Sequence, residues 1–340
     1  MPDEQLAQLS DRLFLATVLL YTVAMLAFAA EQAVRRSRRV ADATAAGMSL
    51  REATAARTRA MAGAGGPTAY VPPVPAAPAA VPAASRGSRA GIAGLLLTGV
   101  GVAVHVGSVV TRGMAADRTP FGNMYEFSSM VALMAVVIFL VLVAAGKVDR
   151  TLGAFVMLPA VLYLGLAGTV LYTAAGPLVP ALDSYWIKIH VFAAILASGA
   201  FLLSGVVALL YLLRVRHDGF VEAGRSPRFP LSVGASLPSA TVLDRVSYGV
   251  IAFAFPVWTF AIIAGAIWAE AAWGRYWGWD PKETWSFITW VLYAGYLHAR
   301  ATAGWKGTKA AWIGVAAAGA LVIDYYVVNI FVVGLHSYAG

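Results

Sequence analysis

Long apolar runs alternate with short polar segments along most of the chain. Eight such runs occupy approximately residues 12–30, 90–111, 127–146, 152–173, 188–213, 246–268, 285–299 and 310–333. A helix of about 20 apolar residues spans a hydrocarbon core of roughly 30 Å and satisfies its own backbone hydrogen bonds. The pattern therefore predicts an all-α fold, a polytopic membrane bundle of about eight transmembrane helices. The run at 285–299 is short, and we expect its flanking tryptophans to extend it.

Composition supports a membrane location and limits the chemistry of the chain. Mean hydropathy is +0.72, 60% of the residues are hydrophobic and 12% are charged, which is far from the composition of soluble globular chains. The chain has no cysteine, so it forms no disulfide and offers no thiolate ligand or thiol nucleophile. Any thiol chemistry must come from another protein.

The distribution of lysine and arginine predicts the orientation. With the N-terminus outside, the four cytoplasmic segments hold 9, 2, 5 and 3 of these residues, which is 19 of the 25 in the chain. Cationic segments resist translocation, so we expect both termini and the tryptophan-rich loop 269–285 on the outer face of a bacterial plasma membrane. The net charge of +8 then lies mostly in cytoplasmic segments, where it is attracted to anionic lipid headgroups. It gives no reason to expect nucleic acid as a partner.

Three regions follow from these patterns. Residues 1–30 are expected to form a retained N-terminal transmembrane helix, because Asp3, Glu4 and Asp11 lie where a cleaved signal peptide carries basic residues. Residues 31–89 are rich in alanine and proline and predict a disordered cytoplasmic linker. Residues 90–340 form the main bundle.

One short stretch, "WGRYWGWDPKETWSFITW", holds half of the ten tryptophans of the chain, namely Trp273, Trp277, Trp279, Trp285 and Trp290. Tryptophan favours the lipid headgroup level, and such an aromatic belt accounts for the scattered Trp186, Trp258, Trp268, Trp305 and Trp312. A belt does not account for five tryptophans in one loop and helix start. Trp273 and Trp277 are four residues apart, so we expect them on one helical face, where a broad aromatic surface suits a flat conjugated ligand.

Histidines flank this stretch in the predicted arrangement. His190 begins the fifth apolar run and His336 follows the eighth, so both are expected at the level of the tryptophan-rich loop. Neutral imidazoles are suitable iron ligands, and the pattern favours haem bound flat between His190 and His336. Arg275 and Lys282 are candidates for the propionates, although both side chains can equally extend to the membrane surface.

Two further histidines lie within predicted membrane helices. His298 is 13 residues beyond Trp285, about 20 Å deeper at 1.5 Å per residue. His105 lies in the second helix, where a functional role and a hydrogen bond between packed helices are both open. Asp324, inside the eighth run, has no assigned role, and no catalytic residue is assigned.

At these residues the sequence resembles the CcsA/ResC family of system II cytochrome c biogenesis proteins, called CcsB in some bacteria. The tryptophan-rich stretch resembles the family's haem-handling segment, the WWD domain. Four other stretches resemble family segments, namely "HVGSVVTRGMAADRTPFGNMYEFSS", "YWIKIHV" with His190, "YLHAR" with His298 and "VNIFVVGLHSYAG" with His336. The resemblance covers roughly residues 95–340 and excludes the first helix and the linker.

The resemblance implies delivery of haem across the membrane and its attachment to apocytochrome c at the outer face. Haem b would be a transiently bound substrate, joined by thioether bonds to a CxxCH motif. The chain would belong to a holocytochrome c synthase, or haem lyase, complex with a ResB-type membrane partner. By this resemblance His298 belongs to an inner haem site, while His190 and His336 ligate haem on the tryptophan-rich surface, with Trp273, Trp277, Trp279, Asp280 and Trp285 around it.

Other interpretations remain open. A b-type electron-transfer protein would also hold haem between membrane histidines, but it usually pairs them on the same helices. A transporter or receptor with an aromatic cage for a cation would not need flanking histidines. Helix packing is the alternative for His105, and Glu126 and Asp280 can instead order their loops through hydrogen bonds.

Overall fold

The chain forms a long helical bundle. In the computed structural model, residues 3–63, 89–177, 184–302 and 304–336 are described, and these ranges contain helices and no β-strand. The long helices are α1 (Glu4–Gly63), α2 (Arg89–Ala116), α3 (Met124–Ala144), α4 (Gly153–Thr169), α5 (Tyr185–Glu222), α6 (Ala240–Trp273), α7 (Pro281–Ala301) and α8 (Thr308–Val322). The short ones are η1 (Arg150–Leu152), η3 (Leu231–Ser236), the π-helical η4 (Ile323–Val328) and α9 (Asn329–Phe331).

The predicted polytopic helical bundle is confirmed. Seven helices of the described ranges are long and apolar enough to cross a membrane. Among the eight long helices, the one that lacks this apolar character is α7, which has 21 residues but carries Lys282, Glu283, His298 and Arg300. Of the eight expected spans, α7 is thus long enough for a crossing but more polar than the others.

The first helix is longer than the sequence pattern predicts. α1 continues to Gly63, so it includes residues 31–63 of the expected linker 31–89. Its backbone can continue because residues 40–63 are rich in alanine and contain no proline, and the first proline after α1 is Pro67. The proline-rich remainder, residues 64–88, lies outside the described residues.

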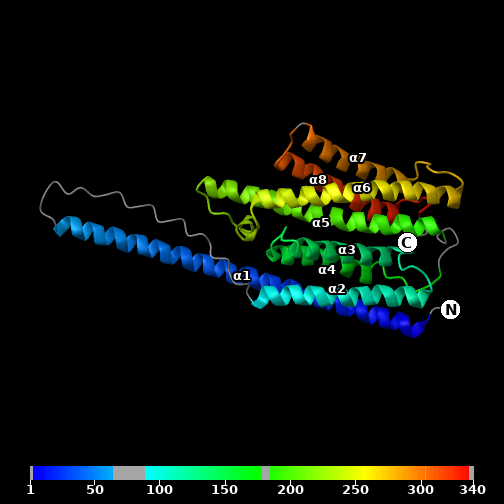
Figure 1. The fold of residues 1–340 in the computed structure, drawn as a ribbon, viewed down its shortest axis with the longest axis horizontal. Helices are drawn as coiled ribbons and strands as arrows, with labels where there is room; N and C mark the ends of the chain where they lie inside the picture. Colours follow the sequence, from blue (N-terminus) through cyan, green and yellow to red (C-terminus); the bar gives the residue numbers. More distant parts are fainter. Residues whose placement is uncertain (1–2, 64–88, 178–183, 303, 337–340) are drawn as a thin grey trace.

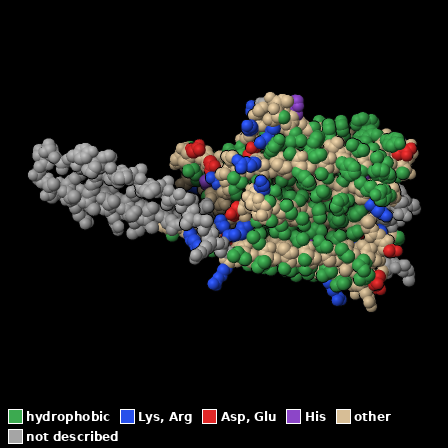
Figure 2. Space-filling model, in the orientation of Figure 1, with side chains coloured by type: hydrophobic (Ala, Val, Ile, Leu, Met, Phe, Trp, Pro, Cys, Tyr) green, Lys and Arg blue, Asp and Glu red, His purple; other side chains and the backbone are tan. Residues whose placement is uncertain are grey.

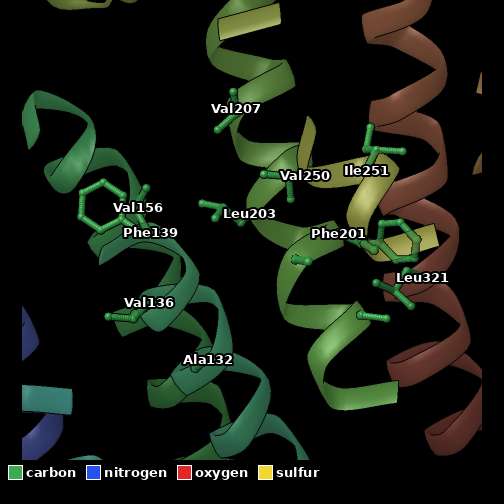
Figure 3. Close-up of a cluster of buried hydrophobic side chains, with 14 of the residues drawn as sticks. Ala132, Val136, Phe139, Val156, Phe201, Leu203, Val207, Val250, Ile251 and Leu321 are labelled. Carbon is green, nitrogen blue, oxygen red and sulfur yellow. The ribbon is translucent and has the colours of Figure 1, made fainter. Parts of the chain in front are cut away.

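Helix α5 lies at the centre of the bundle. It packs against α3, α6 and α8, whereas α1 packs along α2 and α4 (Figure 1). Figure 3 shows the core where side chains of α3, α4, α5, α6 and α8 meet, including Phe139, Phe201 and Ile251. Phe201 stacks on Tyr293 of α7, with ring centroids 3.7 Å apart. The core therefore joins α7 to the apolar helices.

The two ends of the bundle differ in charge. The start of α1, the end of α6 and the start of α7 lie at one end, which we call the tryptophan-loop end because residues 274–280 connect α6 to α7 there (Figure 1). Apolar side chains cover the side of the bundle, and Lys and Arg side chains gather toward the opposite end (Figure 2). Gly274, at φ 70°, ends α6 in the left-handed conformation and turns the chain into the loop.

Candidate functional site

A large cavity opens at the tryptophan-loop end, among α3, α5, α6, α7 and the η4 segment. It contains about 1140 Å³ of space free of protein atoms, including the part that is open to the surroundings. We call it the tryptophan cavity. Its aromatic and polar lining includes Trp258, Trp268, Trp273, Trp277, Tyr276, His190, His336, Lys282, Glu283, Asp324 and Asn329. Ligand pockets usually combine a mainly apolar wall with a few placed polar groups, as this one does.

His190 enters the cavity from the second turn of α5. Its Nδ1 lies 2.7 Å from the carbonyl oxygen of Ala261 on α6. A carbonyl only accepts, so Nδ1 carries the proton and the lone pair of the neutral ring is on Nε2. The ring packs close to α6 at Gly265, where a Cβ atom would lie 2.7 Å from the imidazole. Helix α6 thus fixes both the position and the tautomer of His190.

His336 enters the same cavity from the segment that follows α9. Its Nδ1 donates to Asp280 Oδ2 over 2.9 Å, which again places the lone pair of the neutral ring on Nε2. Its ring centroid lies 5.8 Å from that of Trp268, and the His190 centroid lies 6.2 Å from Trp268 on α6. The two imidazole centroids are therefore at most 12.0 Å apart, the sum of these two distances.

Asp280 joins the start of α7 to the C-terminal segment. It is the N-cap of α7 and forms a capping box with Glu283, with Pro281 at the first helical position. Its carboxylate accepts from the Leu335 N–H at 2.8 Å and the Lys282 N–H at 3.3 Å, in addition to His336. Burial opposes ionisation, but these donors outweigh it and lower the pKa of Asp280 to about 2. The Asp-Pro-Lys-Glu sequence is thus a helix start that also contacts His336.

A partly buried cation lies on the cavity wall. Lys282 Nζ donates to Asn329 Oδ1 at 3.0 Å and lies 5.1 Å from the centroid of the Tyr325 ring. Asp324 is 3% exposed, and its Oδ1 accepts no hydrogen bond from the described residues. Asp324 and Tyr325 belong to the stretch where α8 widens into a π-helix, and Asn329 follows it directly. Such a distortion is frequent at functional sites.

The tryptophans do not form the flat surface that the sequence suggested. Trp273 is the last residue of α6, so Trp277 lies beyond the helix end and the expected shared helical face does not exist. Trp268 and Trp273 meet at 64°, and Trp277 meets Trp279 at 90°. Trp273 and Trp277 line the cavity, whereas the 65% exposed Trp279 and the partly buried Trp285 do not.

Two tryptophans expected in the lipid-facing belt belong to the cavity instead. Trp258 and Trp268 are 5% and 2% exposed, and both line the cavity. A signal for Trp268 is present in the sequence, because Ala261, Ala264 and Gly265 lie on the same face of α6. Small residues at such spacing allow a neighbouring helix to approach closely, which places that face inside the bundle.

The two histidines of the predicted membrane helices, His105 and His298, lie away from the cavity. His105 is fully buried on α2, with Nε2 2.8 Å from Ser129 Oγ and Nδ1 3.5 Å from the Tyr21 hydroxyl. These contacts agree with the packing interpretation. His298 is exposed near the C-terminal end of α7, at the end opposite to the tryptophan loop. The structure therefore brings His190 and His336 together and leaves His105 and His298 apart from them.

A buried ionic network supports one edge of the cavity. Glu126 accepts from Arg112 Nε at 3.0 Å, from Arg118 Nη1 at 2.7 Å and from the Gly122 N–H at 2.9 Å. Asn123 caps α3 by accepting from the Glu126 N–H at 2.9 Å. Glu126 thus holds the loop that carries Gly122 and Asn123, and both of these residues line the cavity.

Comparison with known proteins places these elements in one family. Residues 121–336 match the family described as Cytochrome C assembly protein, so the match runs from the edge of the cavity to His336. The chain is 35% identical over 277 residues to cytochrome c biogenesis protein CcsA of Gloeobacter violaceus, covering 68% of this chain and 82% of that protein. It is 35% identical over 240 residues to CcsA of Guillardia theta, covering 67% and 79%. It is 34% identical over 250 residues to CcsA of Chlamydomonas reinhardtii, covering 72% and 67%.

Proposed function

The chain belongs to the cytochrome c assembly protein family of CcsA-type proteins, and on this premise we propose that its tryptophan cavity binds haem between His190 and His336. In this proposal the bound haem is presented for covalent attachment to apocytochrome c. Membership of the family supports a role in cytochrome c maturation and the involvement of haem. The haem is substrate, received and then released.

The arrangement of the two imidazoles is the observation that carries the proposal. Both rings line one cavity and both contact Trp268, although His190 and His336 are 146 positions apart in the sequence. In each ring Nδ1 is held by an oxygen acceptor, which leaves Nε2 with the lone pair that iron requires. Two neutral imidazoles are a common axial ligand set for haem iron.

The rest of the lining fits a porphyrin. Indole rings surround the histidines and offer apolar surface and edge-on contacts to a conjugated macrocycle, each worth about 0.5–1.5 kcal/mol beyond area burial. Lys282 is the cation on the cavity wall and is our candidate for a propionate contact. Arg275 instead lies 3.5 Å from Glu283, which neutralises part of its charge.

We propose that the tryptophan cavity opens on the outer face of a bacterial plasma membrane. The support is the gathering of Lys and Arg at the opposite end of the bundle, since cationic segments stay in the cytoplasm (Figure 2). Both termini would then face outward with the cavity. Apocytochrome c would meet the haem there and supply the thiols of its CxxCH motif, because this chain has no cysteine. Each thioether forms when a thiol adds across a haem vinyl group.

His298 supports a second part of the proposal. It is exposed near the cytoplasmic end of α7 in the proposed orientation, so it can supply one ligand to haem entering from that side. A ResB-type membrane partner packed against α7 would supply the other ligand. The two proteins together would form the holocytochrome c synthase complex, with haem passing from the inner site to the tryptophan cavity.

Absorption spectra of the purified protein test the proposal. We expect a b-type haem spectrum that His190→Ala and His336→Ala each disrupt, together with failure of c-type cytochromes to mature in cells. His217 lies on α5 outside the cavity lining and pairs with Asp218 at 3.0 Å, so His217→Ala is the matched control and should leave both readouts unchanged. Permanent haem with reversible redox cycling, and normal maturation in the His190 and His336 variants, would instead favour the b-type electron carrier.

A further inference from the structure

His336 depends on side-chain contacts for its orientation. It lies five residues beyond the end of α9, on a segment that leaves the helix at Val332 in an extended conformation. No helix therefore fixes the direction of its ring. The segment is held by Asp280, whose Oδ1 accepts from the Leu335 N–H at 2.8 Å and whose Oδ2 accepts from His336 Nδ1 at 2.9 Å. One carboxylate thus binds two consecutive residues.

Asp280 is itself held rigidly. Its own N–H donates to Glu283 Oε2 at 3.0 Å, and the same oxygen accepts from the Gly278 N–H at 2.8 Å. The side chain is buried, and Gly334 packs directly on it, because a Cβ at Gly334 would lie 2.8 Å from Asp280 Oδ1. The tryptophan loop, the start of α7 and residues 334–336 therefore fit around one carboxylate.

The two proposed iron ligands differ in the group behind them. His190 donates from Nδ1 to a neutral carbonyl, whereas His336 donates to a carboxylate. A carboxylate partner fixes the tautomer and makes the imidazole a stronger electron donor to a metal. His336 is accordingly the more strongly donating of the two.

We infer that Asp280 is a positioning residue that orients His336 and increases its basicity toward haem iron, without contacting the haem itself. This inference rests on the proposed function, in which His336 ligates haem. It also accounts for the Asp-Pro-Lys-Glu sequence, because the helix start that follows the tryptophan loop then supports an axial ligand from the C-terminal segment.

The test uses full-length protein purified with its haem, as wild type, Asp280→Asn, Asp280→Ala, Gly334→Ala and His336→Ala. Asp149→Ala is the matched control, because Asp149 is also an N-cap aspartate but lies at η1, away from the cavity. Haem affinity, the reduction potential and the absorption spectrum are measured with and without added imidazole. Added imidazole can replace a lost axial ligand but cannot restore a misfolded site, so these measurements distinguish a change in iron ligation from a loss of folding.

The Asp280→Asn variant can still accept the His336 hydrogen bond, so we expect it to bind haem through His336, but more weakly than the wild type. Its reduction potential should rise, because the neutral amide makes His336 a weaker donor, and its haem affinity should fall about 10- to 100-fold. The Asp280→Ala variant should resemble His336→Ala, and added imidazole should restore the six-coordinate spectrum in both. Gly334→Ala should weaken haem binding while Asp149→Ala matches the wild type.

Three results would overturn the inference in different ways. If His336→Ala loses its ligation while both Asp280 variants keep the wild-type potential and affinity, the proposed function stands and the role of Asp280 is wrong. If His336→Ala keeps the wild-type spectrum, His336 is not a ligand and the proposed function fails with it. Haem loss in Asp280→Ala that imidazole does not restore, with an unchanged potential in Asp280→Asn, would indicate a purely structural role.

Discussion

The imidazole of His190 lies parallel to the indole of Trp268, with 8° between the ring planes and 6.2 Å between the centroids. Trp268 also contacts the ring of His336, at 5.8 Å between centroids and 61° between planes. One buried indole thus contacts both proposed ligands and helps to orient them. Its position makes Trp268 the structural link between α6, which carries it, and the two segments that carry the histidines.

Replacement of Trp268, on α6, should weaken haem binding more than replacement of any tryptophan in the loop 274–280. The Trp268→Leu variant removes the surface shared by His190 and His336, and one aromatic contact to each ring is worth about 0.5–1.5 kcal/mol. We expect haem occupancy to fall several-fold in protein purified under equal conditions, as measured by the ratio of haem to protein.

The matched control is Trp279→Leu. Trp279 belongs to the tryptophan-rich stretch but is 65% exposed and does not line the cavity. Equal haem loss in both variants would contradict a larger contribution of Trp268 to haem binding. It would instead favour haem binding to a surface formed by the whole tryptophan-rich stretch.

Much of this architecture could be predicted from the sequence, because the bilayer imposes long apolar helices. Each apolar run overlaps an observed helix, the last one across α8, η4 and α9, although α1 and α5 extend well beyond their runs. The family resemblance is confirmed by the match over residues 121–336. Periodicity reports which face of a helix is apolar but not which helices meet. The belt interpretation of Trp268 is wrong for this reason, because its burial depends on α5 packing against α6, and the small residues on its face of α6 are the one sign of that packing in the sequence.

The geometry of the tryptophan loop depends on a single turn. A helix continuing past Trp273 would have placed Trp277 on the same face, but the left-handed Gly274 ends it. That glycine is a recognisable C-terminal signal in the sequence. The hydrogen bond from His336 to Asp280 has no such signal, because it joins residues 56 positions apart whose segments meet only in the folded bundle.

Gly265 should be intolerant of a side chain. A Cβ at this position would lie 2.7 Å from both Cε1 and Nδ1 of His190, which is closer than atoms pack without displacement. The Gly265→Ala variant is therefore expected to push the ring off the Ala261 carbonyl, to change the haem spectrum and to lower haem affinity. Gly249→Ala, also on α6 but with no atom within 4 Å of where its Cβ would lie, should bind haem normally.

Thermal unfolding in detergent would complete this comparison. Gly249→Ala should keep or slightly raise the midpoint, since alanine is favoured over glycine inside helices by up to about 1 kcal/mol. A haem spectrum unaffected by Gly265→Ala would show that haem ligation by His190 does not require its ring to pack against α6.

Glu126 should be a strong stability determinant. Its carboxylate is 1% exposed and is shared by Arg112 and Arg118, which are 3% and 9% exposed. Removing one partner of a buried ion pair leaves an uncompensated charge and typically costs about 3–5 kcal/mol. We expect Glu126→Gln to lower the unfolding midpoint markedly and to loosen the Gly122 edge of the cavity.

Asp218→Asn is the control for Glu126→Gln. Asp218 pairs with Arg214 at 2.8 Å, but its side chain is 36% exposed, and exposed ion pairs contribute only about 0–1 kcal/mol. A similar loss of stability in the two variants would mean that burial of the Glu126 network is not what makes it important.

Lys282 and Asp324 should be energetically coupled. The Lys282 ammonium lies 3.4 Å from the main-chain oxygen of Asp324, and the Asp324 side chain is buried with Oδ1 unsatisfied among the described residues. Replacing Lys282 with methionine removes a nearby cation from a buried acid, so Lys282→Met should destabilise the haem-free protein. Adding Asp324→Asn removes the acid as well, and the double variant should recover part of that stability. Unfolding midpoints of the wild type, the two single variants and the double variant form a double-mutant cycle, and strictly additive changes would contradict the coupling.

Haem affinity distinguishes the stabilising role of Lys282 from its proposed role in haem binding. If the Lys282 ammonium also contacts a haem propionate, the double variant should recover stability but not haem binding.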